Sequence, residues 1–459
     1  MAAPRKYDVV VIGGGIGGYP TAIRLSQRGL KVALVEERYL GGECTNYGCV
    51  PSKAIYRLAE SFRSLRGFVD QVPQLRWRDV RRWIESVVER LRDGIGYLLD
   101  LYGADLYQDK AVVAGDRVRL AKSGVEIEAR EVVIATGTDP RPLPGVGFDG
   151  QYVVSNRELF YLDEPPGRLL IVGGGVIGVE IAYSFSEIGT EVVVVEALDR
   201  ILPMYDRDVS RTVARFLRGR EVKLFTSTTV TRVERRGREV EVTLSSGDRL
   251  SVDRVLVAIG RVPRSREALL GVDGVKLDRH GYIAVGDGCR AAPGIRAVGD
   301  VAGPPLLAHK ALIEGLVAAE SIAQGRDLPR PDPHAIPTAV FTGLEVAIVG
   351  YSEEELRRLG VKYRRYRLPI GVISAALIKG GEEGFVKLLV EEGGRRVLGI
   401  HIVAPNASEV VSAMLPLYLG MLSLDEASRS PYPHLTVSEA VREAAELVLG
   451  EPIHVFVKR

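Results

Sequence analysis

Two cysteines near the start of the chain have the spacing of a pair that acts together. Cys44 and Cys49 lie in GGECTNYGCVPSK, residues 41–53, and the 459-residue chain has only three cysteines in all. Such a pair can form a redox-active disulfide, bind a metal or fill a core as two small apolar groups. A zinc site needs more ligands than this segment offers, and three cysteines are too few for a secreted disulfide scaffold. The spacing alone leaves a redox pair and two buried thiols open.

An ideal helix would keep these two cysteines apart. Five residues of helix rise about 7.5 Å and turn about 500°, which separates the Cα atoms by about 8–9 Å. A disulfide needs Cα atoms within about 7 Å of each other. We therefore expect a distorted helix start between the cysteines, in which Gly48 supplies the backbone freedom.

A glycine-rich nucleotide signature occurs twice, and its first copy directly precedes the cysteine pair. Residues 7–36 read YDVVVIGGGIGGYPTAIRLSQRGLKVALVE, and residues 168–196 read RLLIVGGGVIGVEIAYSFSEIGTEVVVVE. Each copy has an apolar strand, G-x-G-x-x-G, an amphipathic stretch and a second strand that ends in an acid about 20 residues on, as in dinucleotide-binding βαβ units. We predict two dinucleotide sites, in which Glu36 and Glu196 accept hydrogen bonds from a ribose. The glycines are Gly13, Gly15, Gly18, Gly173, Gly175 and Gly178.

The order of these motifs indicates what the cysteines do. A nicotinamide gives two electrons as a hydride, a disulfide takes two electrons, and a flavin can pass them between the two. Because the cysteine pair follows the first unit at once, its sulfur atoms can lie against the cofactor of that unit. We therefore predict electron transfer between a nicotinamide, a flavin and the Cys44–Cys49 pair.

Composition and charge narrow the choice of partners. The chain is 46% hydrophobic and 26% charged with a net charge of +2, which gives no reason to expect a nucleic acid or a membrane surface as partner. No apolar run approaches the roughly 18 residues of a membrane span. The first strand is expected from about Asp8, which leaves no room for a signal peptide. These features predict a cytoplasmic protein of about three domains.

Nearly the whole chain resembles the class I pyridine nucleotide–disulfide oxidoreductases. The resemblance rests on the cysteine segment, both glycine-rich units and the strings VVIATGT, VLVAIGRVP, RAVGDVAG, LAHKA and PHLTVSE. It implies an α/β fold with two Rossmann-like dinucleotide-binding domains and a C-terminal α+β dimerisation domain. The implied domains are FAD-binding (1–147), NAD-binding (148–267), a central segment that completes the FAD domain (268–336) and dimerisation (337–459).

The resemblance also implies which residues hold the two cofactors. Glu36 would bind the adenosine ribose of FAD, and Asp300 would lie near its ribityl chain. Glu196 favours NAD over NADP, because an acid repels a 2′-phosphate. The FAD residues are Gly13, Gly15, Gly18, Glu36, Lys53, Gly137 and Asp300. The NAD residues are Gly173, Gly175, Gly178, Glu196 and Gly260.

The same resemblance gives the cysteines and two charged residues their roles. Cys44 would exchange with the substrate, and Cys49 would be the thiolate in charge-transfer contact with the flavin. Lys53, paired with Glu180, would lie near the N5 edge of the flavin. No metal is expected.

A base is implied near the C-terminus, because a thiol must lose its proton before it attacks a disulfide. His434 would take this proton, and Glu439 would orient its imidazole. In the family this histidine comes from the other subunit, so the resemblance implies a homodimer with a shared active site. The implied reaction oxidises dihydrolipoamide, free or as a lipoyl group on a protein, and reduces NAD⁺.

The chain differs from the usual sequence of the family's dehydrogenases at several positions, most of them around the disulfide. Tyr432-Pro433-His434-Leu435-Thr436 replaces His-Ala-His-Pro-Thr, and Glu43 replaces a threonine. Gly343-Leu344 and Leu312-Ile313 also differ from the usual His-Pro and acidic pair. These changes leave open an NAD(P)H-dependent disulfide or quinone reductase with another acceptor. A non-catalytic flavin redox sensor is disfavoured because the redox residues are complete.

Overall fold

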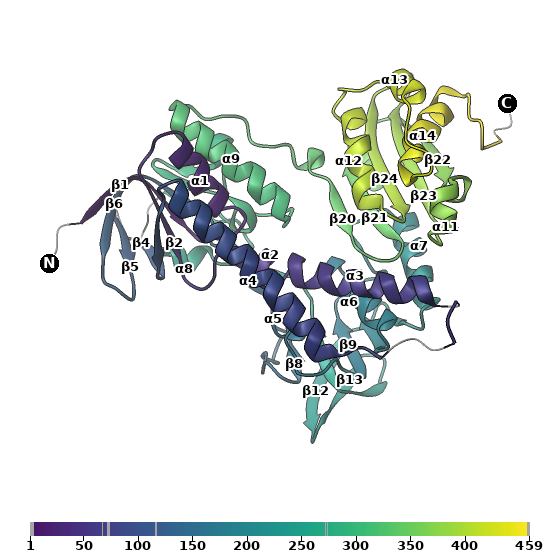
Figure 1. Cartoon of the computed structure of the whole chain (residues 1–459), viewed down its shortest axis with the longest axis horizontal. Helices are drawn as coiled ribbons and strands as arrows, with labels where there is room; N and C mark the ends of the chain where they lie inside the picture. The colour runs from purple at the N-terminus through teal and green to yellow at the C-terminus, as the bar shows by residue number, and fades with distance from the viewer. Residues whose placement is uncertain are drawn as a thin grey trace.

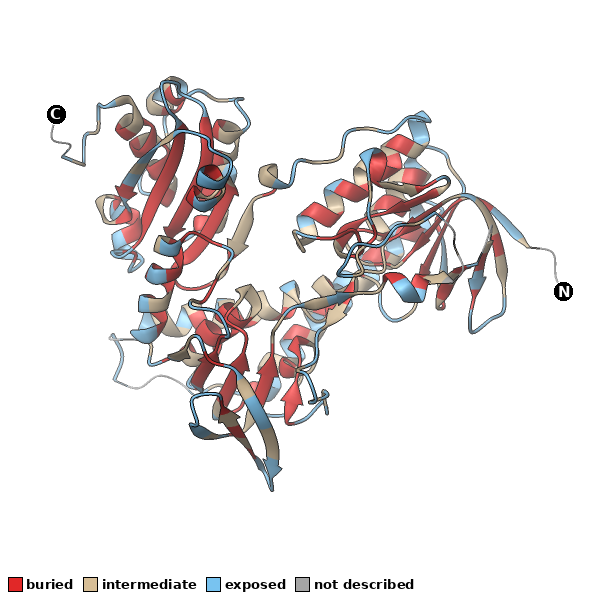
Figure 2. Cartoon of the chain, turned by 180° about the vertical axis from the view of Figure 1, so that it is seen from behind, coloured by how far each residue is buried: buried red, intermediate tan, exposed pale blue. Residues whose placement is uncertain are grey.

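The computed structural model of the chain describes residues 4–66, 68–70, 74–114, 117–270, 272 and 274–456. In Figure 1 the first glycine-rich unit lies on the left, the second at the lower centre and the C-terminal domain at the upper right. Figure 2 shows that buried strands form the centre of each part. Among the described residues, no helix has both the length and the apolar character needed to cross a membrane.

The first sheet carries the first glycine-rich unit at its centre. Its strands are β1 (Arg5–Ile12), β2 (Val32–Glu36), β3 (Asp105–Gln108), β4 (Ala111–Ala114), β5 (Arg117–Leu120), β6 (Glu126–Ile134), β17 (Leu269–Leu270), β18 (Arg290–Ala292) and β19 (Ile295–Ala297). The parallel core runs β3-β2-β1-β6-β19, and β4 and β5 extend it as an antiparallel pair. Two helices that pack together cover it, namely α1 (Tyr19–Gln27) and α9 (Ala308–Gln324). Strands from 269–297 therefore complete a sheet that begins at residue 5.

The second sheet repeats this plan around the second unit. Its parallel order is β11 (Lys223–Phe225), β10 (Glu191–Val195), β9 (Arg168–Val172), β15 (Arg254–Val257) and β8 (Val153–Val154). An antiparallel sheet adjoins it, formed by β12 (Val230–Arg236), β13 (Glu239–Leu244) and β14 (Arg249–Val252). Its helices are α5 (Asn156–Leu159), α6 (Val176–Glu187) and α7 (Arg207–Arg218), and α8 (Ser265–Ala268) follows it. The chain enters and leaves this unit through the pair β7 (Thr138–Pro140) and β16 (Arg261–Pro263).

The third sheet is antiparallel and forms the C-terminal domain. Its order is β20 (Thr338–Val340), β21 (Glu345–Gly350), β24 (Val397–Ala404), β23 (Phe385–Glu391) and β22 (Tyr363–Pro369). Its helices are α10 (Glu353–Arg358), α11 (Ser374–Ile378), α12 (Ala407–Tyr418), α13 (Leu424–Arg429) and α14 (Ala440–Leu449). Short 3₁₀ turns occur in several parts of the chain, namely η1 (Asp287–Cys289), η2 (Gly299–Ala302), η3 (Pro333–Ala335), η4 (Ile370–Val372) and η5 (Val437–Glu439).

The cysteine segment forms two helices with a break between them. These are α2 (Gly42–Asn46) and α3 (Cys49–Leu65), and α4 (Trp77–Leu101) follows. Gly48 adopts φ −116° and ψ −106°, outside the helical region, so the expected distortion at this residue is confirmed. One buried apolar cluster joins Ile55 of α3 to Phe185 of α6 and Val340 of β20. The helix that begins at Cys49 is therefore held by both neighbouring domains.

Candidate redox site

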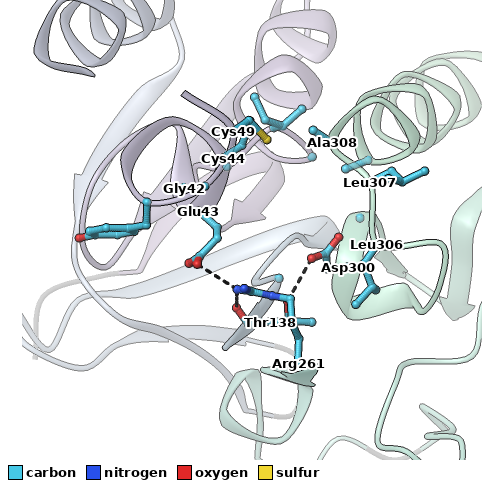
Figure 3. A pocket seen from close by; sticks show the side chains of 18 of the residues that line it. Gly42, Glu43, Cys44, Cys49, Thr138, Arg261, Asp300, Leu306, Leu307 and Ala308 are labelled. Atoms are coloured by element: carbon cyan, nitrogen blue, oxygen red, sulfur yellow. Dashed lines mark hydrogen bonds and ion pairs between the residues drawn. The ribbon is translucent and has the colours of Figure 1, made fainter. Parts of the chain in front are cut away.

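A cavity of about 780 Å³ opens between the first unit, the cysteine helices and the start of α9. This volume is within the range of cofactor pockets. In Figure 3, Cys44 and Cys49 lie across the cavity from Leu307 and Ala308. The predicted residues that line the cavity are Gly13, Gly15, Glu36, Cys44, Cys49, Lys53, Gly137, Glu180 and Asp300.

The first glycine-rich turn leaves room for a ligand at its middle glycine only. A Cβ on Gly13 would lie 2.4 Å from the carbonyl oxygen of Ala135, and one on Gly18 would lie 1.8 Å from that of Gly13. A Cβ on Gly15 would meet nothing nearer than 3.7 Å and would enter the cavity. Backbone is thus exposed where a diphosphate must approach, and the residues fit a dinucleotide such as FAD.

Glu36 is fixed in place at the end of β2. One carboxylate oxygen accepts a hydrogen bond from the Gly14 N–H at 2.6 Å, and the other accepts one from the Arg38 N–H at 2.7 Å. The side chain lines the cavity. Its remaining lone pairs can accept hydrogen bonds from ribose hydroxyls.

The second unit builds the same turn, of which Val176 and Ile177 line this cavity. Gly173 has φ +110°, and a Cβ on Gly178 would lie 1.9 Å from the Gly173 carbonyl oxygen. Gly175 has open space around it, and Glu196 accepts hydrogen bonds from the N–H groups of Gly174 at 2.6 Å and Leu198 at 2.8 Å. Gly260 follows β15 with φ +112°. The predicted nicotinamide-site residues are not among the described residues that line the cavity.

The two cysteines interact as free thiols. Cys44 is half-buried, and Cys49 is exposed. The hydrogen bond between the two sulfur atoms is the main cause that raises the pKa of Cys44 and lowers the pKa of Cys49. The Lys53 ammonium lowers the pKa of Cys49 further, against the desolvation of the thiolate by the surrounding protein. These opposite shifts favour a negative charge of the reduced pair on Cys49 rather than on Cys44.

Lys53 and Glu180 form the pair that the resemblance implies. Lys53 Nζ lies 2.7 Å from Glu180 Oε2, and Glu180 Oε1 accepts a hydrogen bond from the Phe341 N–H at 3.0 Å. Lys53 Nζ also lies 4.4 Å from the centre of the Phe341 ring. Phe341 follows β20, so this ion pair ties α3 to α6 and to the C-terminal domain.

Asp300 lies in η2, at the carboxyl end of β19. Its carboxylate accepts a hydrogen bond from Thr138 Oγ1 at 3.0 Å. Burial raises the pKa of Asp300, and Arg261 acts in the opposite direction. Figure 3 shows Asp300, Thr138 and Arg261 together on one wall of the cavity.

An ionic network around Glu43 was not predicted. Arg157 donates to one Glu43 oxygen from Nε at 2.9 Å and from Nη2 at 2.7 Å, and Arg261 Nη2 lies 3.2 Å from the other oxygen. Burial opposes the charge of Glu43, but Arg261 and Arg157 hold its pKa below the ordinary value. In the sequence, Glu43 stands out only because the family usually has a threonine at this position. The only signal for Arg261 is its place just after a predicted strand. No local signal marks Arg157.

His434 and Glu439 form a pair of their own in the C-terminal domain. His434 Nδ1 lies 3.0 Å from Glu439 Oε1, and the histidine side chain is 75% exposed. Neither residue is among the described residues that line the cavity. The third cysteine, Cys289, is buried, and burial raises its pKa to about 12.

Comparison with known proteins identifies the family. Residues 7–315 match the family described as pyridine nucleotide-disulphide oxidoreductase, and residues 336–445 match its dimerisation domain. The chain is 37% identical to dihydrolipoyl dehydrogenase of Thermus scotoductus, over 98% of this chain and 99% of that protein. It is 33% identical to dihydrolipoyl dehydrogenase of Bacillus subtilis, over 98% and 99%.

Solved structures agree with this assignment. LpdA from Mycobacterium tuberculosis has a TM-score of 0.89 at 27% identity, over 97% of this chain and 99% of that chain. The Cu(II) complex of the HOCl-induced flavoprotein disulfide reductase RclA from Escherichia coli has a TM-score of 0.87 at 27% identity, over 97% and 100%.

The chain belongs to the pyridine nucleotide–disulfide oxidoreductase family. The expected fold class, with Rossmann-type domains and a dimerisation domain, is confirmed. The protein is an FAD- and NAD-dependent flavoprotein oxidoreductase, and its dimerisation domain supports a homodimer.

Proposed function

We propose that the protein is a dihydrolipoamide dehydrogenase, which oxidises dihydrolipoamide to lipoamide and reduces NAD⁺. The observation that carries this proposal is the cysteine pair, whose negative charge favours Cys49 in a cavity lined by the first glycine-rich unit. The relatives named dihydrolipoyl dehydrogenase support it over nearly the full length of the chain. When bound, FAD supplies the two-electron relay between the cysteine pair and NAD.

In this proposal the residues of the first unit hold FAD. Glu36 binds the adenosine ribose, the 13–18 turn receives the diphosphate, and Gly137 and Asp300 line the path between the diphosphate and the cysteines. Residues 1–147 and 268–336 form this domain, which the shared first sheet supports. Lys53, fixed by Glu180, presents a positive charge at the redox end of the cavity.

The NAD site belongs to residues 148–267 in the same way. Gly173, Gly175 and Gly178 shape the turn, and Gly260 lies across from them. The Glu196 carboxylate is held by two backbone N–H groups, so it accepts hydrogen bonds from the ribose and repels the 2′-phosphate of NADP.

The cysteine pair exchanges with the substrate. One thiolate of dihydrolipoamide attacks Cys44 of the oxidised pair, the Cys44–Cys49 bond breaks, and Cys49 leaves as the thiolate that its lowered pKa favours. The second substrate thiolate then attacks the mixed disulfide. Lipoamide leaves with its own disulfide, and both cysteines are reduced.

Each substrate thiol must lose a proton, and His434 is the proposed base. Glu439 holds its Nδ1, which leaves Nε2 free to take the proton. Within one chain the pair does not line the cavity. In this proposal the partner subunit's His434 therefore faces Cys44, and residues 337–459 form the dimer that creates the shared site.

We also propose a cytoplasmic location, because reducing surroundings would maintain a catalytic thiol pair in a chain so poor in cysteine. Recovery of the native protein in a membrane or extracellular fraction would contradict it.

A steady-state assay tests the substrate. The FAD-loaded enzyme is expected to form NADH from dihydrolipoamide and NAD⁺. If it holds FAD and is reduced by NADH but gives no turnover with dihydrolipoamide, the substrate is wrong and the family chemistry stands. The second candidate is then a disulfide or quinone reductase with another acceptor. Tyr432 and Leu435 beside His434 favour this alternative, because they change the substrate wall.

A further inference from the structure

A buried ion pair in α9 lies directly behind the turn that carries Asp300. Lys310 is 2% exposed and Glu314 is 1% exposed. Lys310 Nζ lies 2.9 Å from Glu314 Oε2. Removing two charges from water is costly, and an apolar pair of the same volume would often stabilise a fold more. We therefore looked for a role of this ion pair other than packing.

Both charges bind the backbone of the Asp300 turn. Lys310 Nζ donates to the carbonyl oxygens of Gly299 at 3.0 Å and Gly303 at 2.7 Å. Glu314 Oε2 accepts a hydrogen bond from the Gly299 N–H at 2.9 Å. The two residues thus bind the backbone of the turn at Gly299, immediately before Asp300, and at Gly303, three residues after it.

The turn needs such support because glycine stands at both of these positions. Gly299 has φ +76° and Gly303 has φ +96°, and glycine reaches many other conformations at little cost. Without the α9 contacts, the backbone would not be confined to the conformation that directs Asp300 into the cavity.

The ion pair also extends to the linker before the C-terminal domain. Arg330 donates to Glu314 Oε1 from Nε at 3.1 Å and from Nη2 at 2.7 Å. Arg330 lies a few residues before η3 and β20. The ion pair that holds the turn is therefore bound in its place by Arg330 of the linker as well as by α9 itself.

We propose that Lys310 and Glu314 are positioning residues for the flavin: they fix Asp300 where its carboxylate can accept a hydrogen bond from a ribityl hydroxyl of FAD. This inference rests on the proposed function, because it takes the FAD contact of Asp300 as given. Neither residue needs to touch FAD. Their effect passes through the backbone of residues 299–303.

The chain offers a matched control for the loss of a buried lysine. Lys387 of β23 is 0% exposed and bonds to Asp206 at 2.8 Å, Asp208 at 2.9 Å and Glu353 at 3.1 Å. Its site joins the second unit to the C-terminal domain, and Lys387 is not among the described residues that line the cavity. Lys310→Met and Lys387→Met each remove one buried cation from the carboxylates that it pairs with.

The experiment compares FAD binding in the two full-length variants. Thermal midpoint, the FAD dissociation constant of the reconstituted apoprotein and the visible spectrum of the bound flavin are measured. We expect both variants to lose thermal stability. Lys310→Met is expected to weaken FAD binding about tenfold or more and to shift the flavin spectrum, because a charged hydrogen-bond network is lost. Lys387→Met is expected to change the FAD constant less than about twofold. Equal effects on FAD would overturn the proposal.

Two further variants keep the test decisive if Lys310→Met does not fold. Glu314→Gln retains the side-chain volume and is expected to weaken FAD binding in the same direction, and an unchanged constant would contradict the proposal. Asp300→Ala removes the acceptor and separates this inference from its premise. If Asp300→Ala leaves FAD binding intact, the proposed FAD contact fails and the positioning role fails with it. If Asp300→Ala weakens FAD binding while Lys310→Met resembles Lys387→Met, only the positioning role is wrong.

Discussion

The two glycine-rich units have the same local chemistry and different surroundings. In each, the carboxylate at the end of the second strand accepts a hydrogen bond from the middle of the turn at 2.6 Å, Glu36 from Gly14 and Glu196 from Gly174. Gly13 and Gly15 of the first turn line the large cavity that contains the cysteines, whereas Gly173, Gly175 and Gly178 of the second turn are not among the described residues that line it. The repeated motif therefore builds a site for a dinucleotide, and the segment that follows it determines the chemistry.

The segments after the two acids begin alike and then diverge. Gly41 donates its N–H to the Gly14 carbonyl oxygen at 2.8 Å, and Leu202 donates to that of Gly174 at 2.7 Å. After Gly41 the chain forms the two cysteine helices. After Leu202 it forms α7, whose N-cap Asp206 binds Lys387 of the C-terminal domain. The first segment carries the proposed redox centre, and the second joins the second unit to the C-terminal domain.

The largest expected effect concerns Cys49. Cys49→Ser is expected to lower dihydrolipoamide-dependent NADH formation by about three orders of magnitude or more, because the pair acts as a unit. FAD content should not change. Cys289→Ser removes the buried thiol of η1, which is not among the described residues that line the cavity, and it is the control expected to keep activity. Normal turnover in Cys49→Ser would disprove the redox role of this segment.

The next effect tests whether two chains share one site. His434→Ala is expected to lower turnover by about 10²–10⁴-fold, as for loss of a general base, whereas His280→Ala at another exposed histidine should not. Heterodimers made from Cys49→Ser and His434→Ala chains are expected to regain one complete site of two. If mixed dimers stay as inactive as either parent, the base does not come from the partner.

Replacing each of the two acids by alanine in turn sharpens the comparison of the two units. Glu36→Ala is expected to weaken FAD binding about tenfold and to leave the KM for NAD⁺ nearly unchanged. Glu196→Ala is expected to raise the KM for NAD⁺ by a similar factor while FAD binding stays constant. Titration of apoprotein with FAD and initial rates against NAD⁺ measure the two effects. The reverse pattern would mean that the cofactor assignments are exchanged.

The smallest expected effect concerns Glu43, which lies in the cysteine segment after the first unit. Glu43→Thr removes the ion pairs with Arg157 and Arg261 and is expected to destabilise the fold by about 1–3 kcal/mol. The folded-state pKa of Glu43 lies below its unperturbed value of 4.5, so these pairs stabilise above that pH and are lost as the pH falls through the lowered pKa. Urea midpoints of the variant and the wild type should therefore converge in acid. Glu37→Gln at the neighbouring Arg264 pair is the control, and a constant gap at all pH values would contradict this account.

Much of the site could be predicted because its parts are local in sequence. The glycine turns, the two acids and the break at Gly48 follow from short-range geometry. The partnership of Lys53 and Glu180 came from the family resemblance, since nothing in their own surroundings indicates it. Each of these features is contained in one motif or carried by a family pattern.

The rest depends on contacts that only the folded topology creates. Arg157 and Arg261 reach Glu43 because α5 of the second unit and the connecting strand β16 both pass beside the cysteine helices. Lys310 and Glu314 look like ordinary members of a helix until the 299–303 turn is packed against them. The position of His434 relative to Cys44 involves a second subunit, which one sequence does not describe.

The most direct test of the central claim is the anaerobic visible spectrum of the FAD-loaded enzyme during addition of NADH. The account predicts that one equivalent of NADH produces a long-wavelength band from a Cys49 thiolate in contact with oxidised flavin, and that Cys49→Ser lacks this band. A wild-type enzyme whose flavin simply bleaches, with no long-wavelength band, would contradict electron transfer to the cysteine pair.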